Sequence, residues 1–248
     1  MADPLHQFVI TPIIPLEIGG IDISFTNSSL WMMIGVVASY LLFSQAMKRK
    51  ALVPGRLQVL VEMLYHMLAD MVRQSIGPEG RRYFPFIFTI FMLVLMGNLL
   101  GLIPYSFTYT SHIIVTASLS FLIFLSVLVI GFARHGTHFL SLFAPAGVPI
   151  FLYPFLVPIE IISYIARPIT HSVRLFANMM AGHIMLKVFA GFSVGLASLG
   201  AIGVAASVIP MLVNSALIGF ELLIALLQAY VFAILACIYL KDTVEIAH

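Results

Sequence analysis

Five apolar stretches, each long enough to cross a lipid bilayer, make up most of this sequence of 248 residues. About 20 residues of helix span the roughly 30 Å of hydrocarbon in a membrane, so the first three stretches predict one membrane helix each, over residues 30–47, 83–104 and 113–133. Only 9% of the residues are charged, whereas a soluble domain carries about 25%. The sequence therefore predicts an all-α, polytopic membrane protein.

The last two apolar stretches, residues 149–192 and 201–240, are about twice as long as the others. As straight helices of about 40 residues they would each be about 60 Å long, at 1.5 Å per residue. Such helices either break at prolines or lie tilted in the bilayer as a hairpin. The candidate prolines are Pro154, Pro158, Pro168 and Pro210. We expect the tilted hairpin, which gives about five membrane-embedded helices in all.

Two further segments complete the expected domain organisation. Residues 55–76 carry apolar side chains at helical spacing with charged residues between them, which predicts an amphipathic helix on the membrane surface. Around Gly19 and Gly20 the sequence alternates between apolar and polar residues, which indicates a small β-hairpin. We expect an external N-terminal segment, residues 1–29, followed by one membrane domain, residues 30–248.

Lysine and arginine are distributed unevenly between the segments that join the predicted helices. Residues 1–30 and 105–112 contain none, residues 48–82 contain seven, and Arg134 begins the next connection. Cytoplasmic loops carry the excess of basic residues. The N-terminus and the 105–112 loop are therefore expected outside, and the C-terminus inside.

Polar and ionisable residues inside the two long stretches form two stripes at helical spacing. An Arg at the centre of a membrane helix costs about 2.5–3.5 kcal/mol, so such residues are functional candidates. The stripes consist of Glu160, Arg167, His171, Arg174 and Asn178, with His183 beyond them, and of Asn214, Glu221 and Gln228. They are expected to face each other or a partner that supplies a charge; the alternative is that they satisfy one another as structural pairs.

Three blocks of sequence resemble one known family. The blocks are residues 172–183, Ser-Val-Arg-Leu-Phe-Ala-Asn-Met-Met-Ala-Gly-His, residues 228–232, Gln-Ala-Tyr-Val-Phe, and residues 98–107, Asn-Leu-Leu-Gly-Leu-Ile-Pro-Tyr-Ser-Phe. The family is subunit a of the F-type ATP synthases: the first block looks like its signature, the second matches its last helix, and the third is similar to it. The resemblance covers residues 83–240.

The resemblance implies partners and roles. Arg174 would face a rotating ring of c subunits with Gln228 across from it, and His183 and Glu221 would carry protons. The other partners would be b-type peripheral stalk subunits and the rest of the complex. An imidazole and an acid in these two places are typical of the alphaproteobacterial and mitochondrial branch, which indicates the bacterial cell inner membrane or the mitochondrial inner membrane. A hairpin that pairs 174 with 228, or 183 with 221, has its turn within residues 200–203.

The resemblance implies a proton-channel stator of the ATP synthase Fo sector, and the chemistry of these residues suits that role. Arg174 stays charged at any relevant pH, so it favours the ionised form of a ring carboxylate beside it and repels a proton that would leak directly. Carboxylate, imidazole and water can relay protons. Two sets of residues would line offset half-channels, an outer set of Glu221, His183, Asn178 and Asn98 and an inner set of Glu160 and His171.

Other functions fit less of the sequence. A secondary ion-coupled transporter is the main alternative, but transporters usually show paired halves and here the intramembrane charges lie in one half. Residues 191–195 match the G-x-S-x-G string of serine hydrolases around Ser193, yet they follow an apolar helix rather than a strand. The chain has no P-loop and no H-E-x-x-H motif, and no basic footprint for nucleic acid. We expect no cofactor, no metal and no catalysis by this chain alone.

Two expectations concern packing rather than chemistry. The single cysteine, Cys237, is expected to be a small packed side chain. Four glycines are expected at positions where helices approach closely: Gly182, Gly191, Gly195 and Gly219.

Overall fold

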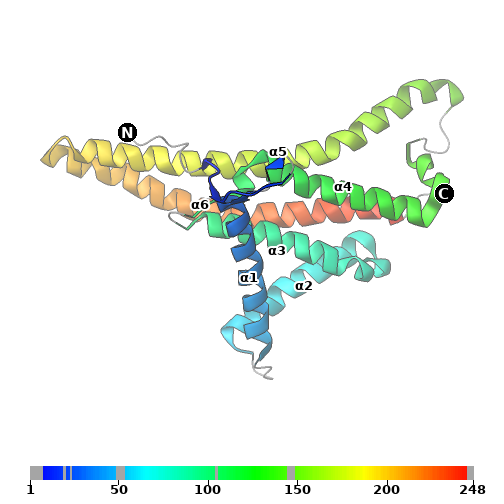
Figure 1. Ribbon diagram of the computed structural model, residues 1–248, viewed down its shortest axis with the longest axis horizontal. Coiled ribbons are helices and arrows are strands. Elements are labelled where there is room, and N and C mark those ends of the chain that lie inside the picture. The colour runs from blue at the N-terminus through cyan, green and yellow to red at the C-terminus, as the bar shows by residue number, and fades with distance from the viewer. Residues whose placement is uncertain are drawn as a thin grey trace. The chain divides into compact units, whose positions relative to one another are not determined.

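The computed structural model describes residues 8–18, 21–22, 24–48, 54–103, 106–143 and 149–244. Within these ranges the chain forms six α-helices and four very short β-strands (Figure 1). Five of the helices are long and apolar enough to cross a membrane. The prediction of an all-α polytopic membrane protein is confirmed.

The six helices follow the predicted order. Their bounds are α1 (Asn27–Lys48), α2 (Arg56–Ile76), α3 (Phe84–Gly101), α4 (Ile113–His135), α5 (Tyr153–Ala197) and α6 (Ala201–Val244). Short 3-10 turns lie between them, η2 (Pro78–Arg82), η3 (Tyr109–Ser111), η4 (Gly136–Phe143) and η5 (Ile150–Leu152). Residue 104, the predicted end of the second stretch, and residue 105, in the loop that follows it, lie outside the described residues.

Helix α2 is the amphipathic one. Its apolar residues Val61, Leu68, Met71, Val72 and Ile76 are buried along one side, which is the spacing that places side chains on a single helical face. Gly77 ends the helix with a φ of 80°, a left-handed conformation that favours glycine.

The chain divides into two compact units, and both long helices contribute to each. Unit 1 consists of Met1–Gln45, Met92–His112 and Leu175–Ala229, and unit 2 of Ala46–Phe91, Ile113–Arg174 and Tyr230–His248. Helix α5 thus passes from unit 2 to unit 1 after Arg174, and α6 returns to unit 2 after Ala229. The single membrane domain expected over residues 30–248 stays a prediction.

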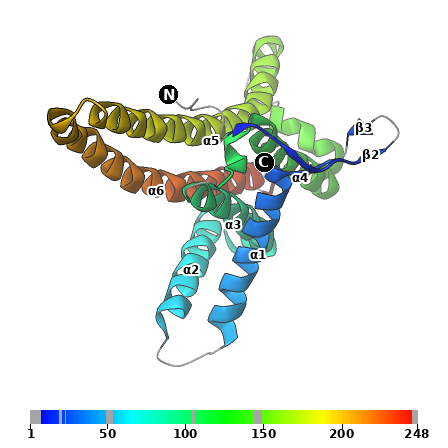
Figure 2. The same cartoon turned by 60° about the vertical axis from the view of Figure 1, so that its left-hand side comes forward.

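In unit 1, the N-terminal strands are tied to the start of α1. Strand β1 (Pro12–Ile14) pairs antiparallel with β4 (Phe25–Thr26), and β2 (Glu17–Ile18) with β3 (Ile21–Asp22) (Figure 2). The side chain of Asn27 accepts a hydrogen bond from the Thr11 amide and donates one to the Val9 carbonyl. The expected hairpin is present, although its glycines at 19 and 20 lie outside the described residues.

Unit 1 also contains the turn between α5 and α6. The two helices run antiparallel to each other from this turn (Figures 1 and 2). Gly200 has a φ of 90°, which only glycine adopts readily. A Cβ at Gly203 would clash with the Leu196 carbonyl oxygen. The chain reversal expected at residues 200–203 therefore depends on two glycines, while Pro158, Pro168 and Pro210 lie inside continuous helices.

In unit 2, aromatic packing joins α4 to η4, and a polar contact joins α4 to α5. Phe139 of η4 is fully buried beside Gly131 of α4. The Ser120 hydroxyl of α4 donates a 2.8 Å hydrogen bond to the Pro168 carbonyl of α5. Helix α4 therefore contacts α5 at one of the prolines inside α5.

Candidate functional site

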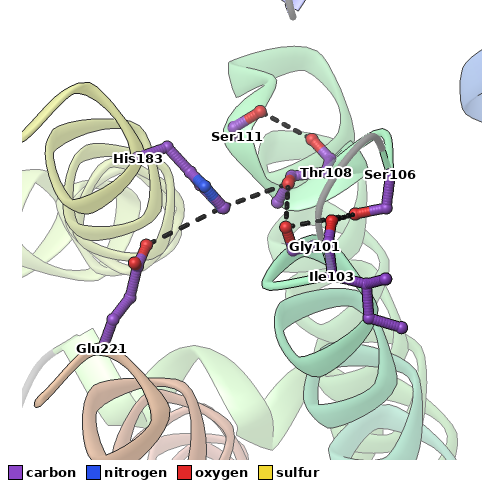
Figure 3. Close-up of polar contacts among 7 residues, drawn as sticks. All are labelled: Gly101, Ile103, Ser106, Thr108, Ser111, His183 and Glu221. Atoms are coloured by element: carbon purple, nitrogen blue, oxygen red, sulfur yellow. Dashed lines mark hydrogen bonds and ion pairs between the residues drawn. The ribbon is translucent and has the colours of Figure 1, made fainter. Parts of the chain in front are cut away.

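Three buried polar side chains come together in unit 1, one from each of three segments (Figure 3). The His183 Nε2 atom of α5 lies 3.1 Å from the Thr108 hydroxyl oxygen and 3.8 Å from a Glu221 carboxylate oxygen of α6. The three residues, Thr108, His183 and Glu221, are at most 7% exposed. We call them the His183 cluster.

Glycines allow these side chains to approach. A Cβ at Gly182, beside His183 on α5, would lie 2.6 Å from the Glu221 Oε1 atom. A Cβ at Gly101 would clash with the Thr108 side chain. Because any other residue at these two positions would push the polar groups apart, the backbone of α3 and α5 shapes the cluster.

Thr108 is held in place by its neighbours. The Ser111 hydroxyl donates to the Thr108 carbonyl at 2.6 Å. The next residue, Tyr109, is 1% exposed, and its hydroxyl donates to the Leu93 carbonyl of α3 at 2.7 Å. Burial raises the pKa of Tyr109 above its usual value, so the phenol stays a neutral donor. The loop thus presents the Thr108 hydroxyl to His183 from a fixed backbone.

Glu221 is the chemically unusual member of the cluster. Among the residues that the structure describes, neither of its buried carboxylate oxygens has a hydrogen-bond partner. A buried carboxylate is costly when it is charged and unpaired. At 3.8 Å, however, His183 can form an ion pair with it once the imidazole is protonated. The pair can therefore hold one proton as two neutral groups or as an ion pair.

Asn98 of α3 lies against the same helix as Glu221. It is fully buried, and its Nδ2 atom donates a 3.2 Å hydrogen bond to the Ala225 carbonyl, one turn beyond Glu221 on α6. Its Oδ1 atom has no partner among the described residues. Asn98 can therefore still accept a hydrogen bond from water or another donor.

The remaining predicted residues of unit 1 do not join the cluster. Asn178 is exposed and makes no hydrogen bond with the described residues. Gln228 is half-buried on α6. Their assigned roles stay predictions.

Unit 2 holds the other predicted residues. Arg174 is exposed on α5, with no ion pair to the described part of the chain, and Glu160 is half-buried. His171 is buried with its ring 3.7 Å from that of Phe232, and neither ring nitrogen has a hydrogen-bond partner among the described residues. The structure does not bring Glu160 and His171 into contact.

Two polar partners were missed by sequence reasoning. Thr108 follows directly on the third sequence block, which ends at residue 107, so a block one residue longer would have included it. Asp242 accepts a 2.7 Å hydrogen bond from Arg167, whose guanidinium lies over the rings of Tyr164 and Tyr239. Beside Lys241 at the end of an apolar stretch, Asp242 is typical of a solvated helix end, so no local signal points to Arg167.

The other motifs occupy helical positions. Ser193 lies inside α5, and its hydroxyl donates to the Ser207 carbonyl of α6 at 3.1 Å, so the G-x-S-x-G string forms no strand-to-helix elbow. Cys237 is fully buried, as expected. In the described ranges, no three His, Cys, Asp or Glu side chains are grouped as a metal site requires.

The packing expectation for glycines was right at one position of four. Gly182 meets Glu221, as described above. For the other three the expectation is wrong within this chain, because a Cβ would meet no described atom within 4 Å: Gly191, Gly195 and Gly219.

Comparisons with known proteins agree on one family. The sequence model described as "ATP synthase A chain" matches residues 28–241. The "ATP synthase subunit a" of Parvibaculum lavamentivorans is 54% identical over 99% of this chain and 95% of its own length. Its namesakes in Mesorhizobium japonicum and Nitrobacter winogradskyi are 53% and 51% identical, over 99% and 100% of this chain and 98% and 100% of their own.

Proposed function

The chain belongs to the ATP synthase A chain family and is a component of the Fo proton channel, and from this premise we propose that two offset half-channels carry protons to and from the carboxylates of a c-subunit ring. The observation that carries the proposal is the buried pair of His183 and Glu221, 3.8 Å apart, whose carboxylate oxygens lack hydrogen-bond partners among the described residues. A purely structural carboxylate would be expected to have such partners.

The His183 cluster supports an outer half-channel. The Thr108 hydroxyl can both donate and accept a hydrogen bond, so it can hold either tautomer of His183. A proton that reaches the imidazole is within ion-pair distance of Glu221. It can pass to the carboxylate through water, or directly once the side chains move to hydrogen-bond distance. Asn98, with a free acceptor oxygen one turn from Glu221, would order water in this path, with Asn178 nearer the ring.

Arg174 is the proposed charge barrier. Its guanidinium is exposed on an apolar helix, where contact with lipid would be costly, so a partner that brings a negative charge is expected. A ring carboxylate beside Arg174 would lose its proton, because the fixed positive charge favours the ionised form. The same charge blocks a proton from crossing without the ring. Gln228 is proposed to face the ring from α6.

Glu160 and His171 are proposed to line the inner half-channel. The half-buried carboxylate of Glu160 can exchange protons with water. His171 has nitrogen atoms with no partner among the described residues, so water that enters this region would find both a donor and an acceptor there.

The proposed setting is a multi-pass subunit in the bacterial inner membrane, with the N-terminus outside and the C-terminus in the cytoplasm. The excess of Lys and Arg in residues 48–82 supports this orientation. The c-ring and b-type stalk subunits are the proposed partners. Because the sequence has no P-loop, we propose that ATP chemistry takes place on other subunits.

ATP-driven proton uptake into inverted membrane vesicles that carry Arg174→Ala tests the proposal. We expect uptake to vanish while an immunoblot still shows assembled complex. The matched control is Arg73→Ala, which removes an exposed arginine from α2 and should leave uptake at the wild-type rate. Unchanged uptake in the Arg174 variant would make that residue a structural charge and overturn the mechanism.

A further inference from the structure

A basic pocket of about 920 Å³ lies in unit 2, where η2 leads into α3 and where α4 ends. Three arginines line it: Arg81, Arg82 and Arg134. Arg134 is paired with Glu79, which also lines the pocket. Arg81 and Arg82 are exposed and form no ion pair or hydrogen bond with the described residues. The pocket therefore holds two uncompensated positive charges and favours an anion.

An apolar groove of about 520 Å³ continues from this pocket. Arg82, Tyr83 and Ile130 line both, so pocket and groove are contiguous. The groove runs between α3 and α4 over Leu122 and Val129. A ligand that fills both needs an anionic group at one end and an apolar chain at the other.

The position of the pocket along the helices matches that chemistry. Helix α3 begins at Phe84 and α4 ends at His135, so the arginines lie where two apolar spans reach the polar boundary of the membrane. The groove lies on the apolar side of that boundary. Phospholipid headgroups and acyl chains meet at the same level.

We propose that this pocket and groove bind an anionic phospholipid, with the phosphate at Arg81 and Arg82 and one acyl chain along the groove. A soluble anion would leave the groove empty. A zwitterionic lipid would bring no net charge to the arginines. An acidic peptide would meet apolar walls over Leu122 and Val129.

Photocrosslinking in the whole ATP synthase complex tests this proposal. The complex is placed in phosphatidylcholine nanodiscs that contain a small fraction of phosphatidylglycerol with a photoreactive acyl chain. We expect crosslinks in peptides that cover residues 122–130. In the double variant Arg81→Gln/Arg82→Gln, half-maximal crosslinking should need about thirtyfold more probe, the equivalent of about 1 kcal/mol for each basic residue.

Two further variants keep the test specific. Arg56→Gln/Arg73→Gln removes the same charge from exposed positions of α2 and should leave crosslinking unchanged. Ser126→Trp fills the groove, so it should reduce crosslinking while both arginines remain in place.

Three results would overturn the proposal. Equal crosslinking by a phosphatidylcholine probe would remove the charge requirement. Equal losses in the two arginine pairs would indicate only a general attraction to anionic lipid. Displacement by millimolar inorganic phosphate or by an acidic peptide would show that the groove contributes nothing. None of these results depends on proton transport, so they leave the proposed half-channels untouched.

Discussion

The two long helices carry polar side chains in both units, but the two sets differ in burial and in how many hydrogen bonds they form. In unit 1, the side chains of His183 and Glu221 are 8% and 5% exposed, and the carboxylate has no hydrogen bond to the described residues. In unit 2, those of Arg167 and Asp242 are 29% and 34% exposed and share a 2.7 Å contact. One pair is buried and under-bonded, and the other is half-exposed and paired.

The difference separates a group that can react from a group that holds structure. A half-exposed ion pair contributes about 0–1 kcal/mol to stability and already has its preferred partner. A buried carboxylate without hydrogen bonds is destabilising, so its retention needs another reason. Uptake and release of a proton is such a reason.

The largest effect is expected from Glu221→Gln. The amide cannot take up a proton, so ATP-driven proton uptake should fall about a hundredfold or more, the range typical of a lost acid-base group. Glu62→Gln on α2, which changes an exposed carboxylate bonded to Gln58, is the control and should have no effect. Uptake within twofold of wild type in the Glu221 variant would show that the buried pair is not in the proton path.

A smaller effect is expected from Gly182→Ala. The new Cβ would lie 2.6 Å from the Glu221 carboxylate and must displace it from His183, so proton uptake should fall about tenfold. Gly191→Ala on the same helix meets no described atom within 4 Å and serves as the control. If both alanines act alike, the close approach of α5 and α6 at Gly182 does not matter for transport.

Removing the ion pair of unit 2 should change stability and proton uptake very little. Asp242→Asn removes the negative partner of Arg167 at a half-exposed site, so the free energy of unfolding should change by about 0–1 kcal/mol. The thermal midpoint of the assembled complex and the rate of proton uptake are the two measurements. If Asp242→Asn lowered proton uptake as much as Glu221→Gln, the proposed difference in role between the two pairs would be wrong.

The smallest effect is expected from pH at His112, beside the His183 cluster. Its ring stacks on Phe107 at 5.0 Å, and burial lowers its pKa below the ordinary value. Near the ordinary pKa of about 6.5, the unfolded loop then binds more protons than the folded one, so local stability falls as pH drops through and below that value. Amide protection of residues 106–112, corrected for intrinsic exchange, should decrease at pH 5.5 in wild type and stay constant in His112→Gln.

Much of the helical architecture follows from the sequence, because length and apolarity decide what can span a bilayer. The predicted stretches 83–104 and 113–133 correspond to α3 and α4. The ends of the long helices were harder to predict. Helix α5 continues past residue 192 to Ala197, with Gly191 and Gly195 inside it, and α6 extends to Val244. Asp242 lies within that last turn and is paired with Arg167.

The candidate site was predictable only in part. The resemblance implies the pairing of His183 with Glu221, a turn at residues 200–203 is consistent with it, and the two side chains lie 3.8 Å apart. Thr108 belongs to a loop, and its contact spans 75 positions in the sequence, so helical spacing does not indicate that contact. The same is true of Asp242 and Arg167, whose contact also spans 75 positions.

The uninterrupted course of α5 has a genetic consequence. Helix α5 runs for 45 residues without a loop, and each residue turns the helix by about 100°. One codon inserted between Arg174 and His183 would swing the imidazole about a quarter of a turn away from Thr108 and Glu221, or rotate everything before it by the same angle. We therefore expect this segment to accept substitutions only at positions away from Arg174, Gly182 and His183, and to accept no insertion or deletion at all.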